Sequence, residues 1–168
     1  MADAEQAYIQ AELKGTTPWV CLPPDERPEA WKHMKRPVVL LKKALYGHHD
    51  SGTFWEQHCD DHVRSVGFNP VGEEWPSCYY HKALSLLLIV YVDDFKLAGP
   101  LSSMKDGWGL LRKGLKIEPE NNIGHFLGCM HTVRPHRFEN GHIANTLAYD
   151  MEDFLGSCVE RYLELAGP

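Results

Sequence analysis

Apolar residues follow one another closely in the middle of the chain and predict a pair of strands. A nearly continuous apolar run covers residues 83–92, and a second apolar segment covers 95–98. Runs of this length are typical of buried or half-buried strands. Two acids, Asp93 and Asp94, lie between them. The pattern therefore predicts a β-hairpin that carries two negative charges at its tip.

Helical spacing of apolar residues marks three further segments. The first begins at Asp50 or Ser51, either of which can cap a helix, and ends before Gly67. The second opens with 103–106, which resembles a capping box. The third, 147–165, is predicted to be a strongly amphipathic helix whose apolar face comprises Met151, Phe154, Leu155, Cys158, Tyr162 and Leu165.

The remaining patterns predict short strands. Residues 77–81 are expected to pair with the long apolar run, and 38–41 are expected to form a buried strand. A strand is predicted at 126–133 and a weak one at 142–145, while residues 1–13 mix strand with a helical turn. Strands and helices in this order predict an α+β fold with a mainly antiparallel sheet.

Length and composition narrow the class of protein. The 168 residues suit one domain, and 43% hydrophobic with 24% charged residues is ordinary for a globular protein. We expect an intracellular, soluble protein with no membrane span, because no apolar run approaches ~20 residues and no signal peptide opens the chain. Five cysteines without a CxxC pair predict reduced, mostly buried thiols.

Charge argues against a domain whose main task is to grip nucleic acid. The net charge is −6 and the pI is about 5.9, whereas such domains are usually basic. A local basic stretch nevertheless exists, and it is either a solvated surface or a nucleic-acid contact: His33, Lys35, Arg36, Lys42, Lys43, His48 and His49.

The acidic pair in the predicted hairpin is the strongest candidate for chemistry. Adjacent carboxylates repel unless a cation neutralises them, and hard divalent cations prefer oxygen ligands. A two-metal phosphoryl-transfer site would require a third carboxylate on a neighbouring strand. The upstream candidates are Asp3, Glu5, Glu12, Asp25 and Glu26. The alternative is an ordinary solvated turn, where Asp is common.

Four motifs in order resemble copia-type retrotransposon reverse transcriptases. Residues 3–9 (DAEQAYI) resemble the first catalytic motif of that family, and 41–47 (LKKALYG) with Trp55 downstream resemble its second. Residues 90–94 (VYVDD) match its third, and 126–128 (FLG) resemble the segment before its primer-gripping region. The resemblance runs from Asp3 to about Val133 and implies a polymerase palm-like antiparallel sheet backed by helices.

The resemblance also implies roles for individual residues. Asp3, Asp93 and Asp94 would be catalytic and would hold Mg²⁺, with the Ala4 carbonyl as a further metal ligand. Tyr8 would stack below the incoming sugar, and Gly47 would let the backbone approach the nucleotide or template. Lys116 would serve as general acid for pyrophosphate. The implied partners are a nucleic acid template-primer and a deoxynucleoside triphosphate. Without this context, Tyr8 is an ordinary core aromatic.

The chain also departs from the family pattern. It begins two residues before Asp3, so we expect residues 1–133 to form a palm-like region without the N-terminal fingers and Asp3 to be poorly held at a fraying terminus. The family's Gln, Pro and Arg positions in the second motif hold Asp50, Gly52 and Thr53. These departures predict that the isolated chain is inactive as a polymerase.

The sequence supports two further hypotheses, one about a non-catalytic role and one about a zinc site. Residues 134–168 are expected to form a strand and an amphipathic helix that packs on the palm. A chain that has lost catalysis would act as a non-catalytic accessory subunit with protein partners in a larger assembly. Separately, His58 and His62 have the i,i+4 spacing of zinc ligands, although no third ligand is evident and a solvated helix face is the alternative.

Overall fold

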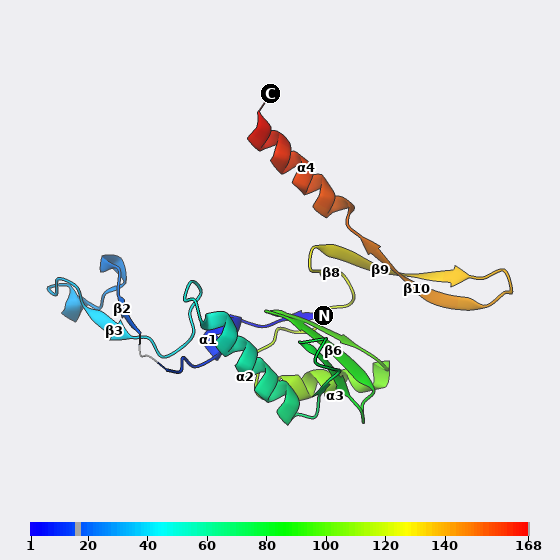
Figure 1. The fold of residues 1–168 in the computed structure, drawn as a ribbon, viewed down its shortest axis with the longest axis horizontal. Coiled ribbons are helices and arrows are strands. Elements are labelled where there is room, and N and C mark those ends of the chain that lie inside the picture. The colour runs from blue at the N-terminus through cyan, green and yellow to red at the C-terminus, as the bar shows by residue number, and fades with distance from the viewer. Residues whose placement is uncertain (16–17, 168) are drawn as a thin grey trace.

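The computed structural model describes residues 1–15 and 18–167 and is built around one antiparallel sheet. Its five strands are arranged in the order β1-β7-β6-β5-β4. Figure 1 shows this sheet beside helices α2 and α3. The strands are β1 (Ala2–Asp3), β4 (Asn69–Pro70), β5 (Cys78–His81), β6 (Leu86–Tyr91) and β7 (Asp94–Ala98). The predicted α+β class with antiparallel pairing is confirmed, as are the predicted 77–81 and 84–92 strand pair and the strand–turn start of the chain.

One hydrophobic core lies between the sheet and its helices. Alternate residues of β6 and β7 are buried, including Leu86, Leu88 and Phe95. They pack with residues of α1 (Ala7–Gln10), α2 (Ser51–Ser65) and α3 (Leu101–Leu111). The alternation leaves the other side of the hairpin free to carry polar groups.

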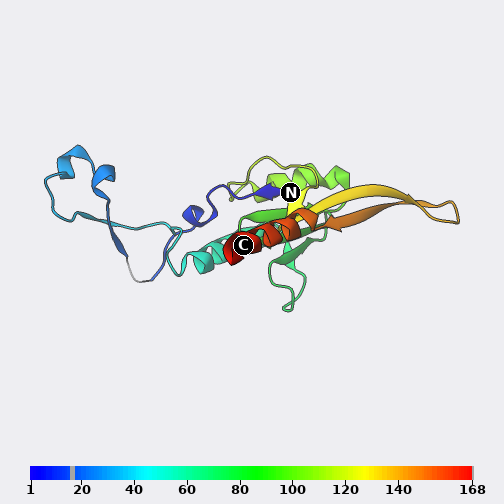
Figure 2. The ribbon, with the colours of Figure 1, turned by 90° about the horizontal axis from the view of Figure 1, so that it is seen from above.

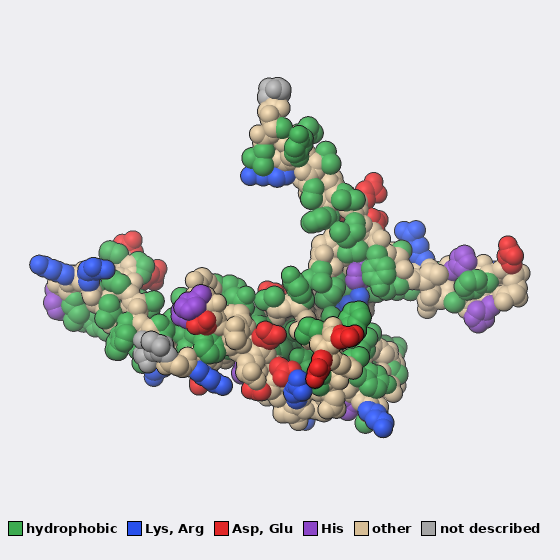
Figure 3. All heavy atoms as spheres, viewed as in Figure 1, with side chains coloured by type: hydrophobic (Ala, Val, Ile, Leu, Met, Phe, Trp, Pro, Cys, Tyr) green, Lys and Arg blue, Asp and Glu red, His purple; other side chains and the backbone are tan. Residues whose placement is uncertain are grey.

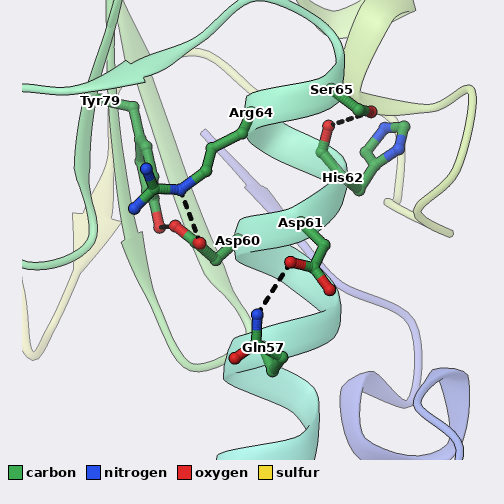
Figure 4. Close-up of polar contacts among 7 residues, drawn as sticks. All are labelled: Gln57, Asp60, Asp61, His62, Arg64, Ser65 and Tyr79. Atoms are coloured by element: carbon green, nitrogen blue, oxygen red, sulfur yellow. Dashed lines mark hydrogen bonds and ion pairs between the residues drawn. The ribbon is translucent and has the colours of Figure 1, made fainter.

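Helix α2 is attached to the sheet by a polar contact as well as by its buried face. Trp55, Cys59 and Val63 are buried on that face, as the helical spacing predicts. The Tyr79 hydroxyl of β5 donates a hydrogen bond of 2.9 Å to Asp60, which also accepts one of 2.6 Å from Arg64 (Figure 4). The helix begins at Ser51 with Asp50 at its N-cap position, as predicted, but neither side chain forms a capping hydrogen bond.

Helix α3 approaches the sheet closely because of a glycine. A Cβ added to Gly107 would lie 2.4 Å from Cδ1 of Leu86 and 2.9 Å from Cδ2 of Leu97. The helix begins at Leu101 after Pro100, with no side-chain cap, so the capping box predicted at 103–106 does not form. Gly107 therefore weakens the helix locally but permits its packing.

Three parts of the chain project from this body (Figures 1 and 2). Strands β2 (Trp19–Cys21) and β3 (Val38–Leu40) form a separate two-stranded ribbon, and the connection between them contains the 3-10 turns Pro24–Glu26 and Glu29–Trp31. Val38 and Leu40 are exposed there, so the prediction of a buried strand at 38–41 is wrong. In the part of the chain that the structure describes, the ribbon pairs with no strand of the central sheet.

A second small sheet contains β8 (His125–Phe126), β9 (Cys129–Arg137) and β10 (Ile143–Asp150). The single strand predicted at 126–133 is in fact two strands, because Leu127 and Gly128 turn the chain with positive φ angles of 52° and 74°. Strand β9 of this small sheet meets β7 of the central sheet where Nζ of Lys96 lies 3.0 Å from Nδ1 of the buried His131. Burial and then Lys96 lower the pKa of His131.

Helix α4 (Glu152–Ala166) is the third projection and buries none of its residues. Figure 3 shows hydrophobic side chains along it that face solvent. The amphipathic helix forms but buries no residue against the palm-like region; its Phe154 ring lies beside Gly128, and residues 147–150 belong to β10 instead. The expected boundary after residue 133 falls inside β9, which continues across it.

Two remaining expectations concern thiols and membrane helices. All five cysteines are free; Cys59 and Cys129 are buried, whereas Cys21 and Cys158 are exposed, so the thiols are not mostly buried as predicted. Within residues 1–15 and 18–167, no helix has the length and apolar character needed to cross a membrane.

Candidate functional site: an acidic hairpin

The acidic pair lies at the turn that joins β6 to β7. Tyr91 pairs with Asp94, so Val92 and Asp93 form a two-residue turn. Val92 has a φ of 54°, a conformation that is strained for a β-branched residue. The indole Nε1–H of Trp55, buried in α2, donates a hydrogen bond of 2.6 Å to the Val92 carbonyl. The helix therefore holds the turn in its strained form.

Strand β1 brings the third carboxylate to this hairpin. Asp3 lies directly opposite Asp94 in antiparallel register, and the Ala4 N–H donates a hydrogen bond of 2.7 Å to the Asp93 carbonyl. The sequence left five upstream acids open for this position, and the structure places Asp3 there. About ninety residues of chain separate the two segments, so the sheet alone brings them together.

The N-terminal segment is held on both of its edges. On the edge away from β7, the Glu118 N–H donates to the Asp3 carbonyl at 2.9 Å, and Ala4 forms an antiparallel bridge with Ile117. The N-terminal ammonium donates to the Asn121 carbonyl at 2.9 Å. The expectation that Asp3 is poorly held at a fraying terminus is therefore wrong, because backbone hydrogen bonds fix the strand that carries it.

Electrostatics at the cluster favour a cation. Burial, then the charges of Asp3 and Asp93, and then a hydrogen bond that protonated Asp94 donates to Asp3 raise the pKa of Asp94. None of these causes is a neighbouring positive charge. The pKa of Asp94 is thus raised first by burial and then by the negative charges of its two neighbours, and a bound cation would offset those charges. We call Asp3, Asp93 and Asp94 the acidic cluster.

The carboxylate oxygens of Asp3, Asp93 and Asp94 do not form one closely spaced group of ligand atoms in this structure. Among the described residues, the one group of three potential ligand side chains whose ligand atoms all lie within 4.8 Å of one another is His48, His49 and Asp50. Asp3 and Asp94 contact each other, so Asp93 is the member that stands farther off. Its side chain is exposed at the turn.

Two tyrosines lie beside the acidic cluster. The rings of Tyr8 and Tyr46 are 4.4 Å apart between centroids and tilted by 34°. Burial, then Asp93 and Tyr8, raise the pKa of Tyr46, which places its hydroxyl in the field of the cluster. Tyr8 also lines a cavity of about 270 Å³ with Trp55 and Val92. It is half-buried, and its role at the sugar stays a prediction.

The other residues assigned by resemblance lie around the same strand. The side chain of Lys116 is exposed. Its backbone carbonyl accepts a hydrogen bond of 2.9 Å from the Glu5 N–H. This contact lies on the edge of the N-terminal segment that faces away from β7. Gly47 has a φ of 92°, and an added Cβ would meet no atom within 4 Å. Its backbone therefore requires glycine and faces open space. The chemical roles of Gly47, Lys116 and the Ala4 carbonyl stay predictions.

The histidine pair at i,i+4 does not form the site that its spacing suggested. Nε2 of His62 lies 2.9 Å from the Leu111 carbonyl and 3.3 Å from the Leu110 carbonyl, at the C-terminal end of α3. His62 thus satisfies helix-end carbonyls. The structure instead groups His48, His49 and Asp50, which the sequence showed only as part of a basic stretch and as a departure from the family motif.

No protein-family model matches the chain, and no solved structure matches it either. The assignment to a family consequently depends on the motifs and on the geometry of the acidic cluster.

Proposed function

We propose that this chain derives from the palm of a copia-type reverse transcriptase and that its acidic cluster binds divalent metal. The observation that carries the proposal is the register of β1 and β7, which sets Asp3 opposite Asp94 and bonds Ala4 to Asp93. The first and third motifs of the resemblance are far apart in sequence, and a palm-type site requires them to be neighbours. The ancestral reaction is templated addition of deoxynucleotides to a primer.

The donor set suits Mg²⁺. Carboxylates and a backbone carbonyl are hard oxygen ligands, and the negative charge that raises the pKa of Asp94 is the charge that a cation would neutralise. Asp3 and Asp93 would hold the ions with the Ala4 carbonyl, and Asp94 would assist. Bound Mg²⁺ would activate a primer 3′-hydroxyl and stabilise leaving pyrophosphate. Tyr8 would contact the sugar, and Lys116 would supply a proton to the pyrophosphate.

The proposal is tested by metal binding. Mn²⁺ replaces Mg²⁺ at oxygen sites and can be followed by electron paramagnetic resonance. We expect wild-type protein to bind Mn²⁺ and the Asp93→Asn variant to bind at least about tenfold more weakly. Asp106→Asn, which removes the same charge from an exposed position of α3, should bind as wild type. Equal binding by all three proteins would refute the site.

Primer extension separates ancestry from activity. The departures at Asp50, Gly52 and Thr53 predict no extension by the isolated chain, even where Mn²⁺ is bound. Extension that disappears in Asp93→Asn would overturn that prediction and show an active enzyme. Metal binding without extension would support a palm that has kept its metal site and lost its reaction.

A second candidate function is that of a non-catalytic accessory subunit. Exposed apolar side chains on α4 and on the β2–β3 ribbon favour it, because protein partners cover such surfaces. Figure 3 shows these side chains facing solvent on α4. Cross-linking mass spectrometry of the protein in its native extract tests this function. Partner cross-links confined to these two projections would support it, and none on either would count against it.

A further inference from the structure

We propose that His48, His49 and Asp50 form a second metal site, which takes a borderline transition-metal ion such as Zn²⁺ or Ni²⁺. Their ligand atoms all lie within 4.8 Å of one another. Nε2 of His49 is 2.9 Å from a carboxylate oxygen of Asp50, and the two imidazole rings stack at 4.7 Å between centroids. We call these three residues the His-His-Asp site.

Little movement is needed to close this site around an ion. Zinc bonds to nitrogen and oxygen are about 2.0–2.1 Å long, so tetrahedral ligand atoms lie about 3.3 Å apart. Atoms that already lie within 4.8 Å reach that spacing by shifts on the order of 1 Å, and His49 is exposed while His48 and Asp50 are only half-buried, so small side-chain rotations accomplish them.

The backbone beneath the site is fixed on both sides. Ser51, which is 1% exposed, donates a hydrogen bond of 2.7 Å to the Leu45 carbonyl and accepts one of 3.0 Å from the Leu45 N–H. The His48 N–H donates to the same carbonyl at 3.0 Å, and the Ser51 N–H donates to the His48 carbonyl at 3.1 Å. Ligands on such a pinned turn lose little conformational freedom when they bind an ion.

The chemistry of the site differs from that of the acidic cluster. Two imidazoles and one carboxylate suit Zn²⁺, Ni²⁺ or Cu²⁺, whereas Mg²⁺ prefers oxygen ligands alone. The Asp50 N–H donates to Nδ1 of His48 at 3.3 Å, so that nitrogen carries no proton in this arrangement. A metal ion would take the place of the proton shared by His49 and Asp50. The carboxylate also offsets the positive end of the α2 dipole, which would otherwise repel a cation.

Three protein ligands leave at least one coordination position open. Exposed residues surround the site, so water or an outside group would fill that position.

Isothermal titration calorimetry with Zn²⁺ and Ni²⁺ tests the inference. The titrations use a parent variant with Cys21→Ser and Cys158→Ser, since these exposed thiols could also bind zinc. We expect one equivalent to bind at pH 7.5. His48→Ala and His49→Ala should each weaken binding at least about tenfold. His33→Ala, at an exposed position of the same basic stretch, is the matched control.

Two outcomes would overturn the inference: binding that is unchanged in both ligand variants, or no binding heat from the parent protein. Circular dichroism should show the same fold for all variants, because His48 and His49 are not core residues. The Asp93→Asn variant should retain this Zn²⁺ binding. The His-His-Asp site can therefore fail, or hold, independently of the acidic cluster. Line broadening by Ni²⁺ in the NMR spectrum should centre on residues 46–52.

Discussion

Replacing Asp94 by Asn should stabilise the metal-free protein. Like charges directly opposite each other on neighbouring strands destabilise a sheet by about 0.2–1 kcal/mol, and Asp3 lies directly opposite Asp94. The adjacent Asp93 adds to the repulsion, and both charges raise the pKa of Asp94. We therefore expect Asp94→Asn to stabilise the chain by about 0.5–1 kcal/mol and to raise its melting temperature by about 1–4 °C.

Divalent metal should make wild-type protein more stable than Asp94→Asn, the reverse of the order without metal. An ion that binds only the folded chain at a hundred times its dissociation constant stabilises it by about 2.7 kcal/mol, or about 5–10 °C for a chain of this length. Wild-type protein should gain that increase in Mn²⁺, and the variant, which lacks an acidic ligand, should gain less. Differential scanning fluorimetry with and without Mn²⁺ measures both effects, and Asp106→Asn controls for the loss of one charge.

The pH dependence has a definite sign. Because the pKa of Asp94 is raised in the folded state, the folded chain binds its proton more tightly than the unfolded chain. The associated stability is present below the ordinary value of 3.8 and is lost as pH rises through the folded pKa. The difference in melting temperature between wild type and Asp94→Asn, measured without metal, should therefore vanish near pH 3. A variant that melts lower than wild type without metal at pH 7 would refute the reasoning.

Three further changes test the surroundings of the site. Trp55→Phe removes the hydrogen bond to the Val92 carbonyl and should cost about 1–3 kcal/mol in urea unfolding. Gly107→Ala should destabilise the chain by about 1–2 kcal/mol, because the added Cβ would overlap side chains of the sheet. Gly109→Ala in the same helix meets no atom and should stabilise the chain by about 0.5–1 kcal/mol. Urea unfolding measures both effects. The lowered pKa of His131 predicts stability that is present above about pH 6.5 and falls as pH drops below it, measured as the urea midpoint at pH 7.5 and 5.

Each change has an outcome that contradicts it. An unchanged Trp55→Phe protein would mean that the strained turn needs no support from α2. Equal effects of the two glycine substitutions would show that α3 does not approach the sheet as closely as the structure places it. A midpoint shift that persists in His131→Phe would assign the pH dependence to other groups.

The sequence determined the elements whose patterns are local. The apolar run before Asp93 and the apolar segment after Asp94 specify the hairpin, because alternate side chains on both strands enter one core. The apolar spacing of α2 likewise specified its buried face. The side chains at 50–51 and 103–106 form no capping hydrogen bond, since side chains that could cap a helix found other partners or none.

Only the tertiary structure decided which acid completes the site and which apolar surfaces are covered. Residue types alone left five upstream acids open and the family resemblance singled out Asp3, but only the pairing of β1 with β7 sets Asp3 opposite Asp94, through backbone hydrogen bonds that carry no sequence signal. The amphipathic pattern of α4 predicts a helix, but a pattern does not specify a partner surface, and within the described residues no side chain of this helix is buried. The His-His-Asp site also depends on a turn, because three adjacent residues share a point only where the backbone folds back.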